Sequence, residues 1–424
     1  MPSKTGRKPG SQEPKRFTRQ IEVKGHLIDS MILTRIFDRI MDLKGEFEVE
    51  EFRIGRRKKD YSYARLLVKG ESQAHLERML EEIYRDGAIP VELETVDYEP
   101  SPKDKVLPDN FYSTTNHQTF VYLNSGWVEV ENQMMDKAIV LNLKENRAAC
   151  RLIRDIKKGD LVVVGEAGIR VVPPERPREG VGVFQFMSSQ SSIEKPTQTI
   201  TRRIAEDIFR TKNEGGKVAI VAGPAVVHTG AATSLAKMIR DGYVDALLAG
   251  NALAVHDVEY SIFKTSLGMY LDEGTAAFHG HRHHMAAINE VFKAGSLEEA
   301  VKKGVLKSGI IYECVKKGVP FVLAGSIRDD GPLPDVVTDS VEAQRRYREV
   351  LKDVNVVLMI STVLHSIAVG NMLPSSVKVV AVDINPSSVT KLLDRGSGQA
   401  VGLVSDIGTF LPVLVRYLEE LKNS

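Results

Sequence analysis

Short runs of apolar residues alternate with amphipathic stretches over residues 196–424. Between the runs, apolar residues recur at helical spacing, as at Ile200, Ile204 and Ile208. Runs that are continuously apolar are typical of strands buried on both faces of a sheet. Strands that alternate with helices predict a doubly wound parallel sheet in an α/β domain. The predicted strands are 218–221, 246–248, 320–323, 354–359, 377–382 and 400–404.

The chain before this domain has two other patterns. Residues 17–98 predict a strand at 17–23, a helix with Ile28, Ile32, Ile36 and Ile40 on one face, strands at 46–54 and 61–68, a helix at 76–83 and a strand at 90–96. This βαββαβ order is typical of a ferredoxin-like α+β unit. Residues 99–118 are polar and predict a linker, and a small β module follows with strands at 119–123, 127–130, 137–143, 161–164 and 169–172.

These patterns predict four parts. They are a disordered basic tail (1–16), the ferredoxin-like unit (17–98), the linker with the β module (99–185) and the α/β domain (186–424). A net charge of +1 gives no global field that would attract nucleic acid or a membrane surface. Two cysteines, no apolar run of transmembrane length and no secretory signal predict a cytoplasmic location.

Small and polar residues follow every predicted strand of the α/β domain, where open parallel sheets bind ligands. Six such strand ends in one sheet favour a nucleotide-type ligand over ordinary turn chemistry. Asp383 is placed to accept hydrogen bonds from the ribose hydroxyls of a dinucleotide. No Gly-x-Gly-x-x-Gly opens a helix after a strand, since the nearest match, at 396–398, precedes one. We therefore expect a non-standard variant of the fold.

The sequence HGHRHH at 279–284 resembles a metal site. A helix beginning near His281 would align His281 with His284 and would direct His283 elsewhere. No carboxylate or cysteine lies at a recognised ligand spacing, and Arg282 would oppose a cation, so we predict no metal. We expect a polar cleft wall whose imidazoles bind substrate or transfer protons.

Several other polar residues are candidates for the cleft. Lys264 and Asp329 join His281 as catalytic candidates, and Asp272 and Glu273 are further candidates for binding a cationic substrate. The alternative for each of these lysine and acidic residues is a solvated surface side chain. Cys314 lies on an amphipathic stretch and is interpreted as a small buried hydrophobe rather than a nucleophile.

Four segments resemble the archaeal-type ornithine cyclodeaminases: AGPAVVHTG (222–230), GNALAVHD (250–257), HGHRHH (279–284) and LAGSIRDDGPLPD (323–335). That family shares a region with proteins called lysine-ketoglutarate reductase/saccharopine dehydrogenase bifunctional enzymes. A similar module forms the C-terminal half of a cyanobacterial bifunctional arginine dihydrolase. The resemblance covers nearly everything after residue 16.

The resemblance implies an enzyme that converts L-ornithine to L-proline and ammonia with tightly held NAD, on a sheet similar to that of deoxyhypusine synthase. It implies no particular catalytic base. The predicted cofactor-binding residues are Asn251, Ala252, Asp330, Thr362, Leu364, His365, Asp383, Asn385 and Asp406.

Two other functions stay open at this point. One is an NAD-dependent dehydrogenase or reductase of a saccharopine-like or imino-acid substrate, and the other is a non-catalytic protein that senses NAD or amino acids. The ferredoxin-like unit supports the second, and it equally predicts a homo-oligomer. Residues 1–185 are too short and differently patterned for an arginine-dihydrolase domain, so we expect no arginine hydrolysis.

Overall fold

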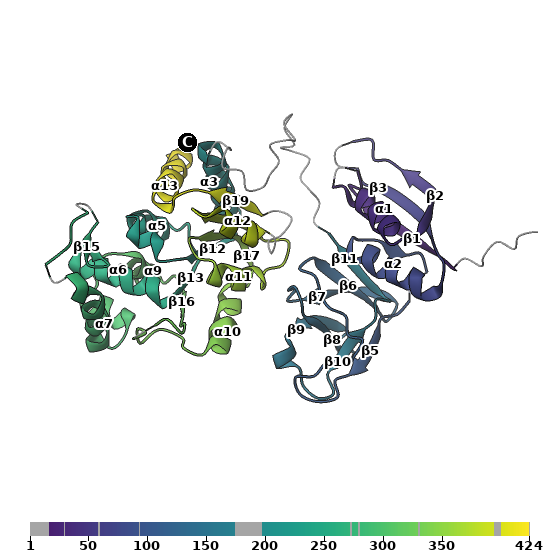
Figure 1. Cartoon of the computed structure of the whole chain (residues 1–424), viewed down its shortest axis with the longest axis horizontal. Helices are drawn as coiled ribbons and strands as arrows, with labels where there is room; N and C mark the ends of the chain where they lie inside the picture. The colour runs from purple at the N-terminus through teal and green to yellow at the C-terminus, as the bar shows by residue number, and fades with distance from the viewer. Residues whose placement is uncertain are drawn as a thin grey trace, which may run out of the picture. The chain divides into compact units, whose positions relative to one another are not determined.

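The computed structural model divides into two compact units, Met1–Gly180 and Val181–Ser424 (Figure 1). None of its described helices is long and apolar enough to cross a membrane. The structure describes residues 17–28, 30–57, 60–92, 94–173, 197–271, 274–278, 280–329, 331–393 and 400–423.

The first unit begins with an antiparallel sheet of strand order β2-β3-β1-β4, the order of a ferredoxin-like unit. Ile32, Ile36 and Ile40 are buried against it, as their spacing predicts, but the placement of Ile28 on this face is wrong, because the helix begins at Ile32 and Ile28 is exposed. The predicted strand at 90–96 is wrong in length, because only Ile89 and Pro90 pair, and proline has no N–H to donate to the ladder. The elements are β1 (Phe17–Gly25), α1 (Ile32–Asp42), β2 (Glu46–Arg53), β3 (Ser62–Gly70), α2 (Gln73–Arg85) and β4 (Ile89–Pro90).

A seven-stranded sheet of order β11-β6-β7-β9-β8-β10-β5 completes this unit. The prediction that 99–118 is a linker is wrong, because Tyr112 is buried there and its amide donates to the carbonyl of Val163. The elements are β5 (Asp97–Pro100), β6 (Gln118–Leu123), β7 (Gly126–Glu131), β8 (Ala138–Asn142), β9 (Arg147–Arg151), η1 (Ile153–Asp155), β10 (Leu161–Val164) and β11 (Ile169–Val172).

The second unit holds a six-stranded parallel sheet of order β16-β13-β12-β17-β18-β19. Numbered along the chain, its strands lie in the order 3-2-1-4-5-6, so the direction of winding reverses between β12 and β17. All the predicted strands of this domain are present. They are β12 (Lys217–Ala222), β13 (Ala246–Gly250), β16 (Phe321–Ala324), β17 (Val354–Ile360), β18 (Lys378–Asp383) and β19 (Val401–Val404).

Helices cover both faces of this sheet. On one face, Ile220 and Leu247 pack into a core with α3 (Thr197–Asn213), α4 (Ala225–His228), α5 (Ala232–Arg240), α6 (Asn251–Phe263), α7 (His283–Ala294), α8 (Leu297–Lys302), α9 (Ile310–Lys317) and α13 (Ile407–Asn423). On the other, Val221 and Leu248 pack with α10 (Ser340–Val350), α11 (Leu364–Gly370) and α12 (Pro386–Leu393). Between α6 and α7 lie β14 (Thr265–Ser266), β15 (Met269–Tyr270) and η3 (Gly280–Arg282).

Candidate functional site

The backbones after β12 and β17 approach closely at the point where the winding reverses. The amide of Gly223 donates to the carbonyl of Ile360 at 2.9 Å, and a Cβ on Gly223 would lie 2.0 Å from the carbonyl oxygen of Ser361. Only glycine fits there. The hydroxyls of Ser361 and of Ser366, in α11, are buried without a hydrogen-bond partner in the described part of the chain. These two hydroxyls are therefore available to donate to or accept from a ligand at this end of the sheet.

His365 bridges the ends of β13 and β17. The hydroxyl of Tyr347 donates to the carbonyl of Ala249 at 2.9 Å and lies 3.2 Å from Nδ1 of His365. Because that hydroxyl proton is already engaged, Nδ1 of His365 is the donor and Nε2 carries the lone pair. Burial lowers the pKa of His365, and Asp329 opposes this effect. Nε2 lies over Gly250, where a Cβ would come within 2.7 Å of it.

Carboxylates follow the last two strands of the sheet. One oxygen of Asp383 accepts the amide of Asn385 at 2.8 Å, and the side chain of Asn385 accepts the amide of Ser387 at 2.9 Å at the start of α12. Within the described residues, the second oxygen of Asp383 accepts no hydrogen bond. Asp406 accepts the amide of Thr409 at 3.1 Å in the first turn of α13. Leu364 is 67% exposed beside these strand ends, where an apolar surface suits a flat ligand ring.

The remaining predicted cofactor residues that the structure describes lie at the same edge of the sheet. Asn251 is buried in the first turn of α6, and its side-chain oxygen accepts the amide of Leu333 at 3.1 Å. Ala252 follows it in that turn, and Thr362 lies against Gly223. Asp330 lies outside the described residues.

The three predicted catalytic residues lie on three separate segments of the second unit. Lys264 is exposed at the end of α6, with its Nζ 5.5 Å from the centre of the Tyr260 ring. Asp329 accepts the amide of Ser326 at 2.8 Å within a loop after β16. His281 lies in η3, but the structure does not describe its side chain. Asp272, Glu273 and His279 lie outside the described residues. Their catalytic roles stay predictions.

Three histidines instead surround one buried carboxylate, forming a group that we call the histidine cluster: His228, His256, Glu259 and His284. The Glu259 side chain has no exposed surface. It accepts hydrogen bonds from Thr265 at 3.0 Å and from the amide of Gly268 at 2.9 Å. Nδ1 of His256 lies 3.3 Å from Glu259 Oε2, and Nδ1 of His284 lies 3.9 Å from the same oxygen.

Hydrogen bonding keeps Glu259 ionised inside the protein. Burial alone would raise the pKa of Glu259, but His256, His284, Gly268 and Thr265 together lower it below its usual range. The donor atoms of His256, Glu259 and His284 lie within 4.8 Å of one another, close enough to hold a cation. However, Thr265, Gly268, His256 and the amide of Leu267 already supply four donors to a carboxylate with about four acceptor positions. We therefore interpret the cluster as a hydrogen-bonded group, and the absence of a metal stays a prediction.

His228 closes the histidine cluster from α4. Its ring lies edge-on to that of His256, with ring centres 4.4 Å apart, and its Nδ1 lies 2.7 Å from the hydroxyl of Ser266. Burial lowers the pKa of His228 to about 4, with a further contribution from His256, so this ring is neutral at physiological pH. His228 and His256 lie within the segments 222–230 and 250–257 that carry the family resemblance, whereas Glu259 was not predicted. The available signal was the spacing of three residues between His256 and Glu259 on one helix.

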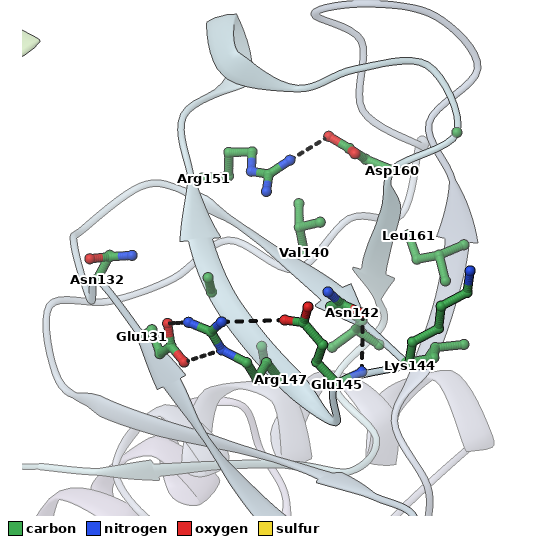
Figure 2. Close-up of a pocket in the computed structure, with 15 residues that line it drawn as sticks. Glu131, Asn132, Val140, Asn142, Lys144, Glu145, Arg147, Arg151, Asp160 and Leu161 are labelled. Carbon is green, nitrogen blue, oxygen red and sulfur yellow. Dashed lines mark hydrogen bonds and ion pairs between the residues drawn. The ribbon is translucent and has the colours of Figure 1, made fainter.

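A surface cavity of about 780 Å³ lies elsewhere, on the β module of the first unit (Figure 2). Arg147 forms ion pairs there with Glu131 and Glu145, and Arg151 pairs with Asp160. Both arginines are therefore already neutralised by carboxylates. All the candidate residues from the sequence belong to the second unit instead.

The strand order and the strand-end chemistry define a Rossmann-type α/β domain. Three family descriptions match the chain: the LOR/SDH bifunctional enzyme conserved region at 18–117, the first C-terminal region of ArgZ-like arginine dihydrolases at 118–201, and their C-terminal Rossmann fold at 202–414. The chain is 55% identical over 412 residues to the ornithine cyclodeaminase of Methanocaldococcus jannaschii, covering 96% of this chain and 97% of the relative. It belongs to the archaeal ornithine cyclodeaminase family.

Two solved structures are similar to this one. The LOR/SDH protein of Methanococcus maripaludis matches with a TM-score of 0.75 and 51% identity, covering 78% of this chain and 100% of that chain. The ternary complex of AgrE with ornithine and NAD⁺ matches with a TM-score of 0.53 and 41% identity. That match covers 96% of this chain and 58% of AgrE, a bifunctional arginine dihydrolase/ornithine cyclodeaminase of Nostoc sp..

Proposed function

We propose that this protein is an NAD-dependent ornithine cyclodeaminase that converts L-ornithine to L-proline and ammonia. The observation that carries the proposal is the 55% identity with an ornithine cyclodeaminase over 96% of the chain. The ternary complex of AgrE with ornithine and NAD⁺ supports both the substrate and the cofactor.

The strand-end residues suit a dinucleotide. The unpartnered hydroxyls of Ser361 and Ser366 lie where the winding reverses, which is where such folds bind dinucleotides. The carboxylate of Asp383 would hold a ribose, and Nε2 of His365 would accept a further hydrogen bond. The residues that would hold NAD are Asn251, Ala252, Thr362, Leu364, His365, Asp383, Asn385 and Asp406, together with Asp330, which lies outside the described part.

The chemistry has no net redox change. When bound, NAD⁺ supplies an acceptor for the hydride of the amine-bearing carbon and later the donor for the cyclic imine. Between these two events the second amine of ornithine attacks the imine carbon, and ammonia leaves. The protein must therefore hold one amine unprotonated, supply a proton to the departing nitrogen and keep water from hydrolysing the imine.

Incubation of the purified protein with L-ornithine and NAD⁺ tests this function. We expect proline and ammonia in equal amounts, with no lasting NADH absorbance. Steady accumulation of NADH would instead identify a simple dehydrogenase. NAD⁺ binding without any product would identify a binding protein.

Three further properties belong to this proposal. The two cysteines are free and buried, which supports a reducing, cytoplasmic location. The edge strand β2 exposes Val49 and Phe52, 46% and 39% exposed, which supports assembly of a homo-oligomer through this unit. A role in proline biosynthesis from ornithine follows from the proposed reaction. Light scattering of the purified protein tests the second property.

A further inference from the structure

The histidine cluster lies beside the proposed nucleotide site. His256 follows Asn251 by five residues on α6, which is about 7.5 Å along the helix axis. His228 ends α4, five residues after Gly223. Its neighbour Thr229 is held near Asp406, because a Cβ on Gly408 would lie 2.9 Å from both residues. The cluster therefore borders the ends of β12, β13 and β19, where the cofactor residues converge.

The hydrogen bonds of Glu259 determine which histidine nitrogens carry protons. Thr265 donates its hydroxyl proton to Glu259, so Nδ1 of His283, 2.9 Å from that hydroxyl, is a donor. Nδ1 of His256 faces the Glu259 carboxylate and must also donate. The lone pair of the neutral His256 ring is consequently on Nε2. A buried carboxylate behind a histidine orients a general base in this way.

Side-chain exposure distinguishes the members of the cluster. Glu259 is fully buried and His256 is 7% exposed, whereas His284 is 40% exposed. Nδ1 of His284 is itself buried and faces Oε2 of Glu259 at 3.9 Å. The ring centres of His256 and His284 are 4.9 Å apart. The cluster thus has a fixed, buried pair of Glu259 and His256 and one imidazole open to solvent.

We propose that the histidine cluster is the acid–base centre that acts on the amines of a diamino acid, and this inference rests on the proposed function. His256 takes a proton from the substrate ammonium: the N–H bond breaks, its electron pair stays on the substrate nitrogen, and the proton bonds to Nε2. His256 later returns this proton to the nitrogen that leaves as ammonia. Glu259 is a positioning residue that fixes the tautomer of His256 and balances the charge of its imidazolium form.

Two variants test this assignment in the full-length protein. Glu259→Gln keeps the side chain's size but removes its charge, and His256→Asn removes the base while keeping a polar group. Each should lower kcat for ornithine by about 100-fold or more, the contribution usual for general acid–base catalysis, with little change in the KM for ornithine and the Kd for NAD⁺. The double variant should be no slower than the worse single variant, since the two residues act as a unit.

Glu290→Gln is the matched control, because Glu290 is a carboxylate on α7 that forms an exposed ion pair with Lys293. Its kcat should equal that of the wild-type protein. Retention of kcat in both cluster variants, while the wild-type protein is active, would overturn the assignment and leave the proposed function intact. One zinc ion per chain in the purified protein would also overturn it, because the metal would occupy the histidine lone pairs.

A measurement without turnover separates the two proposals. Ornithine added to the protein saturated with NADH, which cannot accept a hydride, should shift the imidazole NMR signals that His256→Asn and His284→Asn remove. Absence of turnover in the wild-type protein would refute the proposed function. The NMR result then decides the site: shifted cluster signals support it as the amine-binding site, and unshifted signals refute it.

Discussion

Asp383 gives the sharpest test of where the nucleotide ribose binds. One oxygen of its side chain accepts the amide of Asn385 at 2.8 Å, and in the proposed function the second accepts a ribose hydroxyl. Asp383→Ala removes both. Loss of charge-assisted bonds to the ribose should weaken NAD⁺ binding by about 1–3 kcal/mol, which is roughly a 5- to 150-fold increase in Kd. Loss of the turn bond should also lower the free energy of unfolding, by about 0.5–1.5 kcal/mol.

Asp383→Asn separates these effects. Asparagine still accepts the amide of Asn385, so the urea midpoint should stay near that of the wild-type protein while NAD⁺ binding weakens. Asp241→Asn is a charge-matched control, because Asp241 precedes β13 and so lies at the opposite edge of the sheet. Isothermal calorimetry measures the Kd of each variant. An unchanged Kd in Asp383→Ala, with a native fold, would refute this placement of the ribose.

Two further variants test the packing and the electrostatics of the fold. Gly223→Ala should destabilise the protein by about 1–3 kcal/mol or more, because the added Cβ would lie 2.0 Å from the backbone oxygen of Ser361. Gly126→Ala is the control, because its Cβ would meet nothing within 4 Å and should change the urea midpoint little. Equal midpoints for the two variants would contradict this packing. Burial raises the pKa of the Glu166 carboxyl to about 7, and Arg85 opposes this effect. Between about pH 4.5 and 7 the folded state therefore keeps a proton on Glu166 that the unfolded state has released, so the wild-type protein loses stability as pH rises through this range. Glu166→Gln should therefore raise the melting temperature at about pH 8 and have little effect at about pH 4, and a uniform effect at both pH values would contradict this assignment.

The sequence predicted the elements that are defined by local apolar patterns. Every strand of the parallel sheet was found, because a strand buried on both faces is a continuous apolar run. The strands β5 and β9 were missed because Asp97–Pro100 is exposed and Arg147–Arg151 has charged ends. Their pairing is determined by neighbouring strands, which short polar sequences do not reveal.

The candidate site was predictable only in part. Residues that follow strands were identified because the carboxyl ends of parallel strands share one edge of a sheet. The histidine cluster depends on how α4, α6, the β14–β15 hairpin and α7 fold against one another, and local apolar patterns do not predict these contacts. Glu259 was not predicted as a partner of the run at 279–284, because it lies 25 residues before His284.

The central claim is an internal redox cycle, and a reaction with limiting NAD⁺ tests it most directly. The purified protein is supplied with excess L-ornithine, NAD⁺ at a small fraction of that amount, and no other oxidant. We predict that proline and ammonia form in equal amounts and far exceed the NAD⁺ present, since each hydride is returned. Product formation that stops at one equivalent of NAD⁺, with matching NADH, would contradict the account.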